Sequence, residues 1–141
     1  MTGRLERNEF VQRQVLIADD NRIVRRILRS FLTRRRDLEV CGEAENGREA
    51  VEKTRALKPD LVLLDLVMPE MNGVEAASLL KQSMPDVPII LFTMYSESIG
   101  EHLATAIGID AVLSKPDGLT TLSKVVDVLL PRDNQAAESS Y

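Results

Sequence analysis

Five short apolar runs recur along the chain, and stretches of a helix's length separate them. The runs are Val15–Ala18, Leu38–Cys41, Leu61–Leu64, Ile89–Phe92 and Ala111–Leu113. The first, third and fourth runs show no alternation with polar residues, which indicates strands covered on both faces. Such strands occur in parallel sheets that carry helices on either side. The pattern therefore favours an α/β layer architecture, in which the less uniform second run suits an edge strand.

Five helices are predicted in the intervening stretches and after the last run. They cover residues 23–32, 46–58, 73–84, 96–107 and 119–130. The second helix begins at Asn46, which has capping-box spacing to Glu49, and it ends before Pro59. The regular alternation of strand and helix predicts a doubly wound α/β sandwich with right-handed crossovers.

Apolar stripes predict which face of three of these helices points toward the core. In the first helix the stripe consists of Ile23, Val24, Ile27, Leu28, Phe31 and Leu32. In the fourth helix it consists of Ile99, Leu103, Ala106 and Ile107. In the fifth helix it consists of Leu122, Val125, Val126, Leu129 and Leu130.

Length and composition exclude several classes of protein. With 141 residues, we expect one domain over residues 14–130, a loose N-terminal extension over 1–13 and a flexible tail over 131–141. One cysteine and one histidine exclude a disulfide framework and a zinc site rich in Cys or His. A net charge of −4, the lack of a long apolar run and the lack of a secretory signal predict a cytoplasmic chain that binds neither nucleic acid nor membranes.

Polar residues follow four of the five predicted strands. They are Asp19 and Asp20 after the first strand, Asp65 after the third, Thr93 at the end of the fourth and Lys115 after the fifth. In an open parallel sheet, the carboxyl ends of the strands share one edge, where ligands bind. The second strand brings only Gly42 and Glu43, which we expect to play no comparable role.

These residue types at one edge point to phosphoryl chemistry. Three crowded carboxylates repel one another unless they share a cation or a proton, and an oxygen-only cluster suits Mg²⁺. An ammonium and a hydroxyl beside the metal would neutralise the oxygens of a phosphoryl group during transfer. Asp65, at the end of a central strand, can accept the phosphoryl group as an acyl phosphate.

These motifs together resemble the receiver domain of bacterial response regulators. The resemblance rests on the segments VLIADD at 15–20 and LLDLVMP at 63–69, on Asn72-Gly73, on Thr93 and on Lys115-Pro116, and it covers about residues 14–130. It implies a flavodoxin-like fold with strand order 2-1-3-4-5. It also implies phosphoryl transfer from a phosphohistidine on a sensor histidine kinase or a histidine phosphotransfer protein.

The resemblance also implies a role for each site residue. Asp65 would be the phosphoacceptor. Asp20, Asp65 and the backbone carbonyl of Val67 would bind Mg²⁺, and Asp19 would act mostly through water. Lys115 and Thr93 would contact the phosphoryl oxygens. The Lys115–Pro116 peptide bond would be cis.

Three residues depart from the family pattern. Val112 stands where many receivers have an aromatic residue that moves with the threonine, and Tyr95 could take over part of that movement. Val67, often polar in receivers with fast turnover, and Tyr95 flank the route of water to the acyl phosphate. We therefore expect the phosphorylated chain to hydrolyse slowly.

The leading hypothesis is a stand-alone receiver that switches a surface of its own. Helix 96–107, strand 111–113 and helix 119–130 would form that surface, which contacts an output protein or a second copy of the chain. Glu97, Glu101 and Leu103 lie near it.

Three alternatives remain open. An aspartyl phosphatase of the haloacid-dehalogenase type also uses an Asp nucleophile and Mg²⁺, but it needs a second acid where Val67 stands. A protein-binding module of the same fold would act without phosphate. The chain could also be the receiver half of a truncated helix-turn-helix transcriptional regulator.

Overall fold

The computed structural model describes residues 11–94 and 101–131. In chain order, its elements are β1 (Arg13–Ala18), α2 (Arg22–Leu32), β2 (Leu38–Ala44), α3 (Gly47–Leu57), β3 (Leu61–Leu64), α4 (Gly73–Ser83), β4 (Ile89–Thr93), α5 (Glu101–Ile107), β5 (Ala111–Ser114), the 3₁₀ turn η2 (Lys115–Asp117) and α6 (Gly118–Leu129). In the segments described, no helix is both long and apolar enough to cross a membrane.

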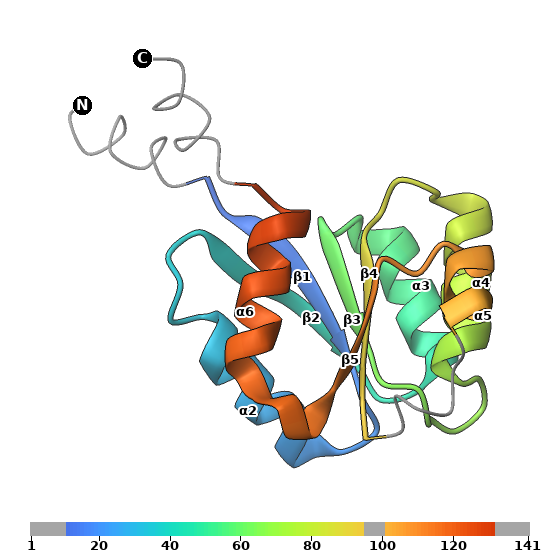
Figure 1. The fold of residues 1–141 in the computed structure, drawn as a ribbon, viewed down its shortest axis with the longest axis horizontal. Helices are drawn as coiled ribbons and strands as arrows, with labels where there is room; N and C mark the ends of the chain where they lie inside the picture. Colours follow the sequence, from blue (N-terminus) through green and yellow to red (C-terminus); the bar gives the residue numbers. More distant parts are fainter. Residues whose placement is uncertain (1–10, 95–100, 132–141) are drawn as a thin grey trace.

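The five strands form one parallel sheet in the order β2-β1-β3-β4-β5. Helices α2 and α6 cover one face of the sheet, and α3, α4 and α5 cover the other (Figure 1). The carboxyl ends of the strands lie at the lower edge of that view. This arrangement confirms the predicted doubly wound α/β fold and the edge position of β2.

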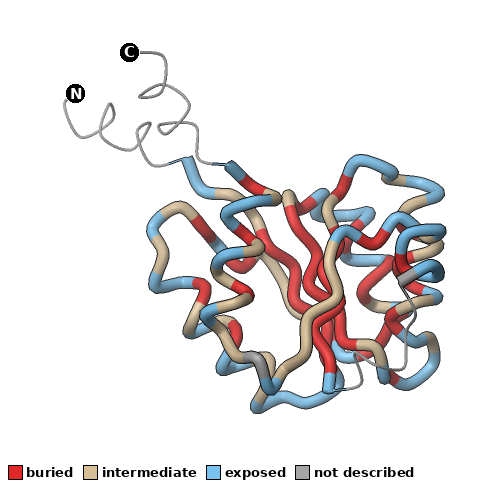
Figure 2. Tube along the Cα trace, viewed as in Figure 1, coloured by how far each residue is buried: buried red, intermediate tan, exposed pale blue. Residues whose placement is uncertain are grey.

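Each face of the sheet carries its own apolar core, because successive residues of a strand point to opposite sides. On the α3–α5 side the core includes Leu16, Val62, Leu64 and Leu91 from the strands. On the α2–α6 side it includes Val15, Ile17, Leu63, Ile90 and Phe92. β3 and β4 are buried throughout, whereas the edge strand β5 is half-buried (Figure 2). Burial on both sides explains why the central strands are continuous apolar runs.

The pairing of β2 with β1 contains one irregularity. Val15 pairs with Val40, but the next residue of β1, Leu16, pairs with Gly42. Cys41 is the extra residue, as in a β-bulge. Cys41 and Gly42 therefore both lie on the α3 side, and Glu43 turns toward α2.

Two of the predicted helix faces need correction. In α2, Leu28 and Leu32 are buried, but the side chains of Ile23 and Ile27 are 68% and 51% exposed. The part of the helix that packs on the sheet is narrower than the apolar stripe, and Arg25, whose side chain is 13% exposed, pairs there with Glu43. The outer part of the stripe is therefore left in solvent.

In α5, the buried residue is Ala104, and Leu103 and Ala106 are exposed. Ala104 packs in the same core as Ile109, and Ile107 lies against that core one turn later. This contact turns Leu103 outward. Ile99 lies outside the described residues. In α6, the predicted face holds, with Leu122, Val126 and Leu130 buried.

Asparagine side chains cap the starts of α2, α3 and α4, at Asn21, Asn46 and Asn72. Asn46 caps α3 as predicted, because its Oδ1 accepts a hydrogen bond from the Glu49 amide at 2.8 Å. The Glu49 carboxylate accepts from the Glu45 amide. The reciprocal capping box instead occurs at α4, between Asn72 and Glu75. This cap ends the loop that follows β3.

Candidate functional site

The backbone holds two acids side by side at the carboxyl edge of the sheet. Asp19 directly follows β1, and its amide donates a hydrogen bond to the Ala44 carbonyl of β2 at 3.0 Å. Asp65 directly follows β3, and its amide donates to the Ala18 carbonyl of β1 at 2.9 Å. The backbone hydrogen bonds of the sheet thus continue one residue past β1 and one residue past β3. Because β1 and β3 are neighbours, the two carboxylates meet at the same edge.

Asp20 joins these two acids in a cluster. Oxygen atoms of Asp19, Asp20 and Asp65 all lie within 4.8 Å of one another. Asp19 and Asp65 are buried, with exposed fractions of 2% and 7%, and Asp20 is exposed. Three carboxylates with one open side match the donor set of a hard divalent cation that keeps some of its water. The residues present therefore fit Mg²⁺.

Lys115 connects the cluster to β5. Its ammonium lies 2.6 Å from Oδ2 of Asp19 and 3.6 Å from Oδ1 of Asp65, and its side chain is 15% exposed. Thr93 is fully buried at the end of β4, and its side chain hydrogen-bonds the Asp65 carboxylate. Thr93 also pairs in register with Ser114, the residue before Lys115. The structure thus brings the five predicted side chains together.

Burial and the neighbouring negative charge of Asp19 raise the pKa of Asp65. The positive charge of Lys115 and hydrogen bonds from Thr93 and the Leu66 amide oppose this shift. The repulsion between the two buried carboxylates is thus only partly offset by the Lys115 ammonium. A cation placed among them would relieve that repulsion.

Val67 lies in the loop of residues 66–72, between β3 and α4, and its side chain is 52% exposed. The Gly73 amide donates to the Leu66 carbonyl at 2.8 Å. A Cβ atom at Gly73 would lie 2.2 Å from the Asp65 carbonyl oxygen, so only glycine permits this approach. The start and end of the loop are therefore fixed against each other.

The predicted cis bond at Lys115–Pro116 is wrong. The described residues contain no cis peptide bond. Instead, Lys115 and Pro116 begin the 3₁₀ turn η2, which the Gly118 amide closes on the Lys115 carbonyl. A trans proline at the second residue, with its φ held near −65°, suits such a turn.

An arginine of α2 also braces the site, and the sequence analysis missed it. Arg25 donates to the backbone carbonyl of Asp19 at 2.7 Å and pairs with the Glu43 carboxylate at 3.0 Å. Burial acts to raise the pKa of Glu43, but hydrogen bonds from Arg29 and Arg25 lower it. The expectation that Glu43 plays no comparable role is therefore incomplete, since it anchors the arginine that contacts Asp19.

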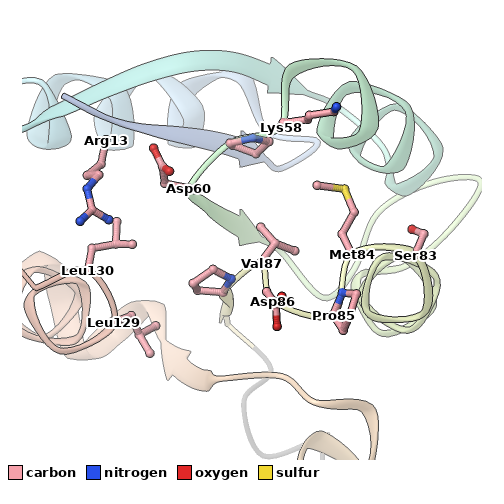
Figure 3. A pocket seen from close by; sticks show the side chains of 12 residues that line it. Arg13, Lys58, Asp60, Ser83, Met84, Pro85, Asp86, Val87, Leu129 and Leu130 are labelled. Atoms are coloured by element: carbon pink, nitrogen blue, oxygen red, sulfur yellow. The ribbon is translucent and has the colours of Figure 1, made fainter. Parts of the chain in front are cut away.

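A pocket lies at the opposite edge of the sheet. Figure 3 shows Arg13, Asp60, Val87 and Leu130 around it. These residues begin β1, precede β3 and β4 and follow α6, so the pocket lies at the amino ends of the strands. It lies away from the acid cluster, and we assign it no part in the chemistry.

A comparison with protein families supports the interpretation of this edge. A family model described as the response regulator receiver domain matches residues 15–127. The chain belongs to this family. The receiver has a curated relative in the response regulator protein VraR of Staphylococcus saprophyticus, with 34% identity over 113 residues. That alignment covers 80% of the receiver chain and 54% of the relative, so the chain spans about half the length of VraR.

Two solved structures show the same fold as this receiver. The response regulator domain of CheB from Thermotoga maritima has 32% identity and a TM-score of 0.71, and the match covers 89% of this chain and 96% of that one. The response regulator protein TrrA from the same organism was solved in complex with Mg(2+)-BeF. It has 31% identity and a TM-score of 0.77, and the match covers 84% of this chain and 100% of that one.

We predict that Asp65→Asn stabilises the metal-free protein. The substitution removes one of the two buried charges, so at neutral pH the melting temperature should rise by roughly 3–5 °C. The raised pKa of Asp65 determines how this gain in stability changes with pH. Protonation of Asp65 favours the folded state, so the advantage of Asp65→Asn should shrink as the pH falls through that pKa and be lost below the ordinary pKa of an aspartate.

Thermal unfolding in chelator-treated buffer across a pH series would measure this effect. Asp86→Asn provides the matched control, because Asp86 is an exposed acid at the opposite edge of the sheet. A gain in stability that is independent of pH, or equal in both variants, would contradict the electrostatic explanation.

Proposed function

We propose that this chain is a phosphorylation-controlled receiver whose phosphoacceptor is Asp65. A carboxylate oxygen of Asp65 forms a bond to phosphorus as the P–N bond of a donor phosphohistidine breaks. The bonding electrons remain on the imidazole nitrogen, and the product on the chain is an acyl phosphate. The convergence of Asp19, Asp20 and Asp65 with the Lys115 ammonium is the observation that carries this proposal.

The three acids would hold the Mg²⁺ ion, with the backbone carbonyl of Val67 as a further ligand. Bound there, the ion would neutralise oxygens of the incoming phosphoryl group. Two observations support this role: the oxygen-only donor set and the Mg(2+)-BeF complex of the relative TrrA. Arg25 would keep the Asp19 backbone in place while the carboxylate binds.

Lys115 and Thr93 act on the phosphoryl group itself. The Lys115 ammonium lies within reach of Asp65 and would pair with one phosphoryl oxygen in place of the carboxylates it now contacts. The Thr93 hydroxyl, which hydrogen-bonds the Asp65 carboxylate, would donate to another oxygen. Both donors already lie beside the Asp65 carboxylate, so each would need only a short movement to reach a phosphoryl oxygen.

The outer face of α2 is the surface that we assign to the phosphodonor. This helix begins two residues after Asp20, and Ile23 and Ile27 lie exposed one turn apart on it. Arg22 and Arg26 are exposed on the same helix. An apolar pair flanked by arginines suits a donor helix with apolar and acidic residues, and its position would bring a phosphohistidine to the acids.

The output surface is assigned to α5, β5 and α6. Thr93 at the end of β4 pairs in register with Ser114 of β5, so a movement of Thr93 would pass directly to this edge strand. Leu103 is 49% exposed on α5, and Val112 is half-buried on β5. Because Val112 is smaller than an aromatic residue, we expect the switch to act through displacement of β5. Glu97 and Tyr95 lie outside the described residues.

Incubation with acetyl phosphate and Mg²⁺ tests the phosphoacceptor directly. Intact mass spectrometry of the wild-type chain should show the addition of one phosphoryl group, and Asp65→Asn should show none. Asp86→Asn should be labelled like the wild type, because Asp86 lies at the opposite edge of the sheet. Labelling of Asp65→Asn, or labelling of the wild type that survives removal of Mg²⁺, would contradict the proposal.

The donor surface predicts a separation between large and small phosphodonors. The donor in this test is a phosphohistidine protein that labels the wild type. Ile27→Glu should lower the rate of phosphorylation by this donor about tenfold, because a charge replaces an interface contact. Labelling by acetyl phosphate should stay unchanged. Val128→Glu is the matched control, since Val128 is 75% exposed on α6. Equal rates for Ile27→Glu and the wild type with the protein donor would rule out this surface.

The phosphorylated form should be long-lived. The Val67 side chain, two residues after Asp65 in sequence, provides no polar group to orient the attacking water. Phosphate release from the labelled chain should therefore take many minutes or longer, and Val67→Asn should speed it several-fold. A half-life of seconds for the wild type would reject the hypothesis.

A further inference from the structure

The loop of residues 66–72 contains a backbone conformation that calls for an explanation. Glu70 has φ of +66°, in the left-handed region that residues other than glycine rarely adopt. Such a residue persists only where its surroundings hold it there. The contacts of Glu70 therefore show what restrains the loop between Asp65 and α4.

The Glu70 side chain contacts the start of α3. Asn46 donates from Nδ2 to Oε2 of Glu70 at 3.0 Å, and the same side chain caps α3 through its Oδ1. Asn46 is 8% exposed, so its end of the hydrogen bond is buried, whereas the Glu70 side chain is 55% exposed. Arg48 lies 3.7 Å from the other carboxylate oxygen of Glu70, farther out.

The backbone of the same loop lies directly against Gly47. A Cβ atom at Gly47 would lie 2.0 Å from the carbonyl oxygen of Met71 and 2.6 Å from its carbonyl carbon. These are backbone atoms, so the loop would have to move to accommodate a side chain. At Gly42, a Cβ atom would meet only the side-chain tips of Leu57 and Leu16, at 2.9 and 3.1 Å.

We propose that Asn46, Gly47 and Glu70 form a latch that positions the loop for metal binding. Val67 lies between the two points where the loop is held, one at the Asp65–Gly73 contact and one at the latch. The latch is also close in sequence to Ala44, whose carbonyl accepts the Asp19 amide. It therefore ties the loop to the strand end that places Asp19. This inference rests on the proposed Mg²⁺ site and names positioning residues for it.

Exchanging the donor and the acceptor of the Asn46–Glu70 hydrogen bond tests the latch. Asn46→Asp keeps a capping oxygen for α3 but places two carboxylates against each other. It should weaken Mg²⁺ binding, measured by titration calorimetry, by about tenfold. Adding Glu70→Gln to Asn46→Asp supplies a donor from the other side and should restore the affinity. Glu70→Gln alone keeps an acceptor for Asn46 and should change the affinity little.

Amide exchange provides a readout that needs no metal. In metal-free protein, residues 66–72 should exchange faster in Asn46→Asp than in the wild type, and the double variant should return to the wild-type rate. Unchanged exchange and Mg²⁺ affinity in Asn46→Asp would overturn the latch. Failure of the double variant to recover either property would overturn it as well.

Gly47→Ala and Gly42→Ala form a matched pair. Gly47→Ala should weaken Mg²⁺ binding, and phosphorylation by acetyl phosphate should recover at saturating Mg²⁺. Gly42→Ala should bind Mg²⁺ like the wild type, and equal behaviour of the two variants would count against the latch. If Gly47→Ala does not fold, the Asn46–Glu70 cycle decides.

The latch and the proposed function can fail separately. An Asn46→Asp variant that accepts phosphate with the wild-type dependence on Mg²⁺ would remove the latch and leave the phosphoacceptor in place. Conversely, the amide exchange of the loop and the Mg²⁺ affinity could respond as expected while Asp65 is not phosphorylated. That result would contradict the proposed function and support the latch.

Discussion

The carboxylates at the ends of β1 and β3 repel one another, and the arrangement of this edge follows from that repulsion. Asp19 and Asp65 are held together by backbone hydrogen bonds that continue the sheet, so neither acid can move apart without breaking the ladder. One ammonium, from Lys115, contacts both. Burial, and then the negative charge of Asp19, raise the pKa of Asp65 despite the ammonium. Such crowding costs the folded protein some stability, and it would be relieved by the cation that the proposed function places there.

The rigidity of the sheet makes that crowding possible. β3 and β4 are buried on both sides, so the positions of Asp65 and Thr93 are set by two apolar cores. The edge strand β5 is only half-buried, and it leads directly to Lys115. The site thus combines side chains from the most constrained strands with one from a less constrained strand. If Asp65 is phosphorylated as proposed, this difference favours β5 as the part of the fold that responds.

Much of the fold and of the acid cluster could be predicted from the sequence. The contacts that could not be predicted share a common cause. Unbroken apolar runs reveal buried parallel strands, and the residues after them must share one edge, which is why Asp65 and Lys115 could be placed together in advance. The contacts of Arg25 and Glu43, and of Asn46 with Glu70, join segments that are distant in sequence, and no local pattern marks them. Likewise, an apolar stripe shows which residues of a helix can be buried, but the packing partner decides which ones are.

The bulged conformation at Cys41 keeps Glu43 on the α2 side of the sheet. Beyond Cys41 the strand is rephased, so Glu43 faces the arginines of α2 and Ala44 faces the opposite core. If Cys41 did not bulge and every residue of β2 alternated strictly from Val40 onward, Glu43 would project toward α3, away from Arg25 and Arg29. Without Cys41 the strand would alternate regularly, and Glu43 would still face these arginines. The bulge therefore lets β2 carry one more residue than β1 without changing the face on which Glu43 lies.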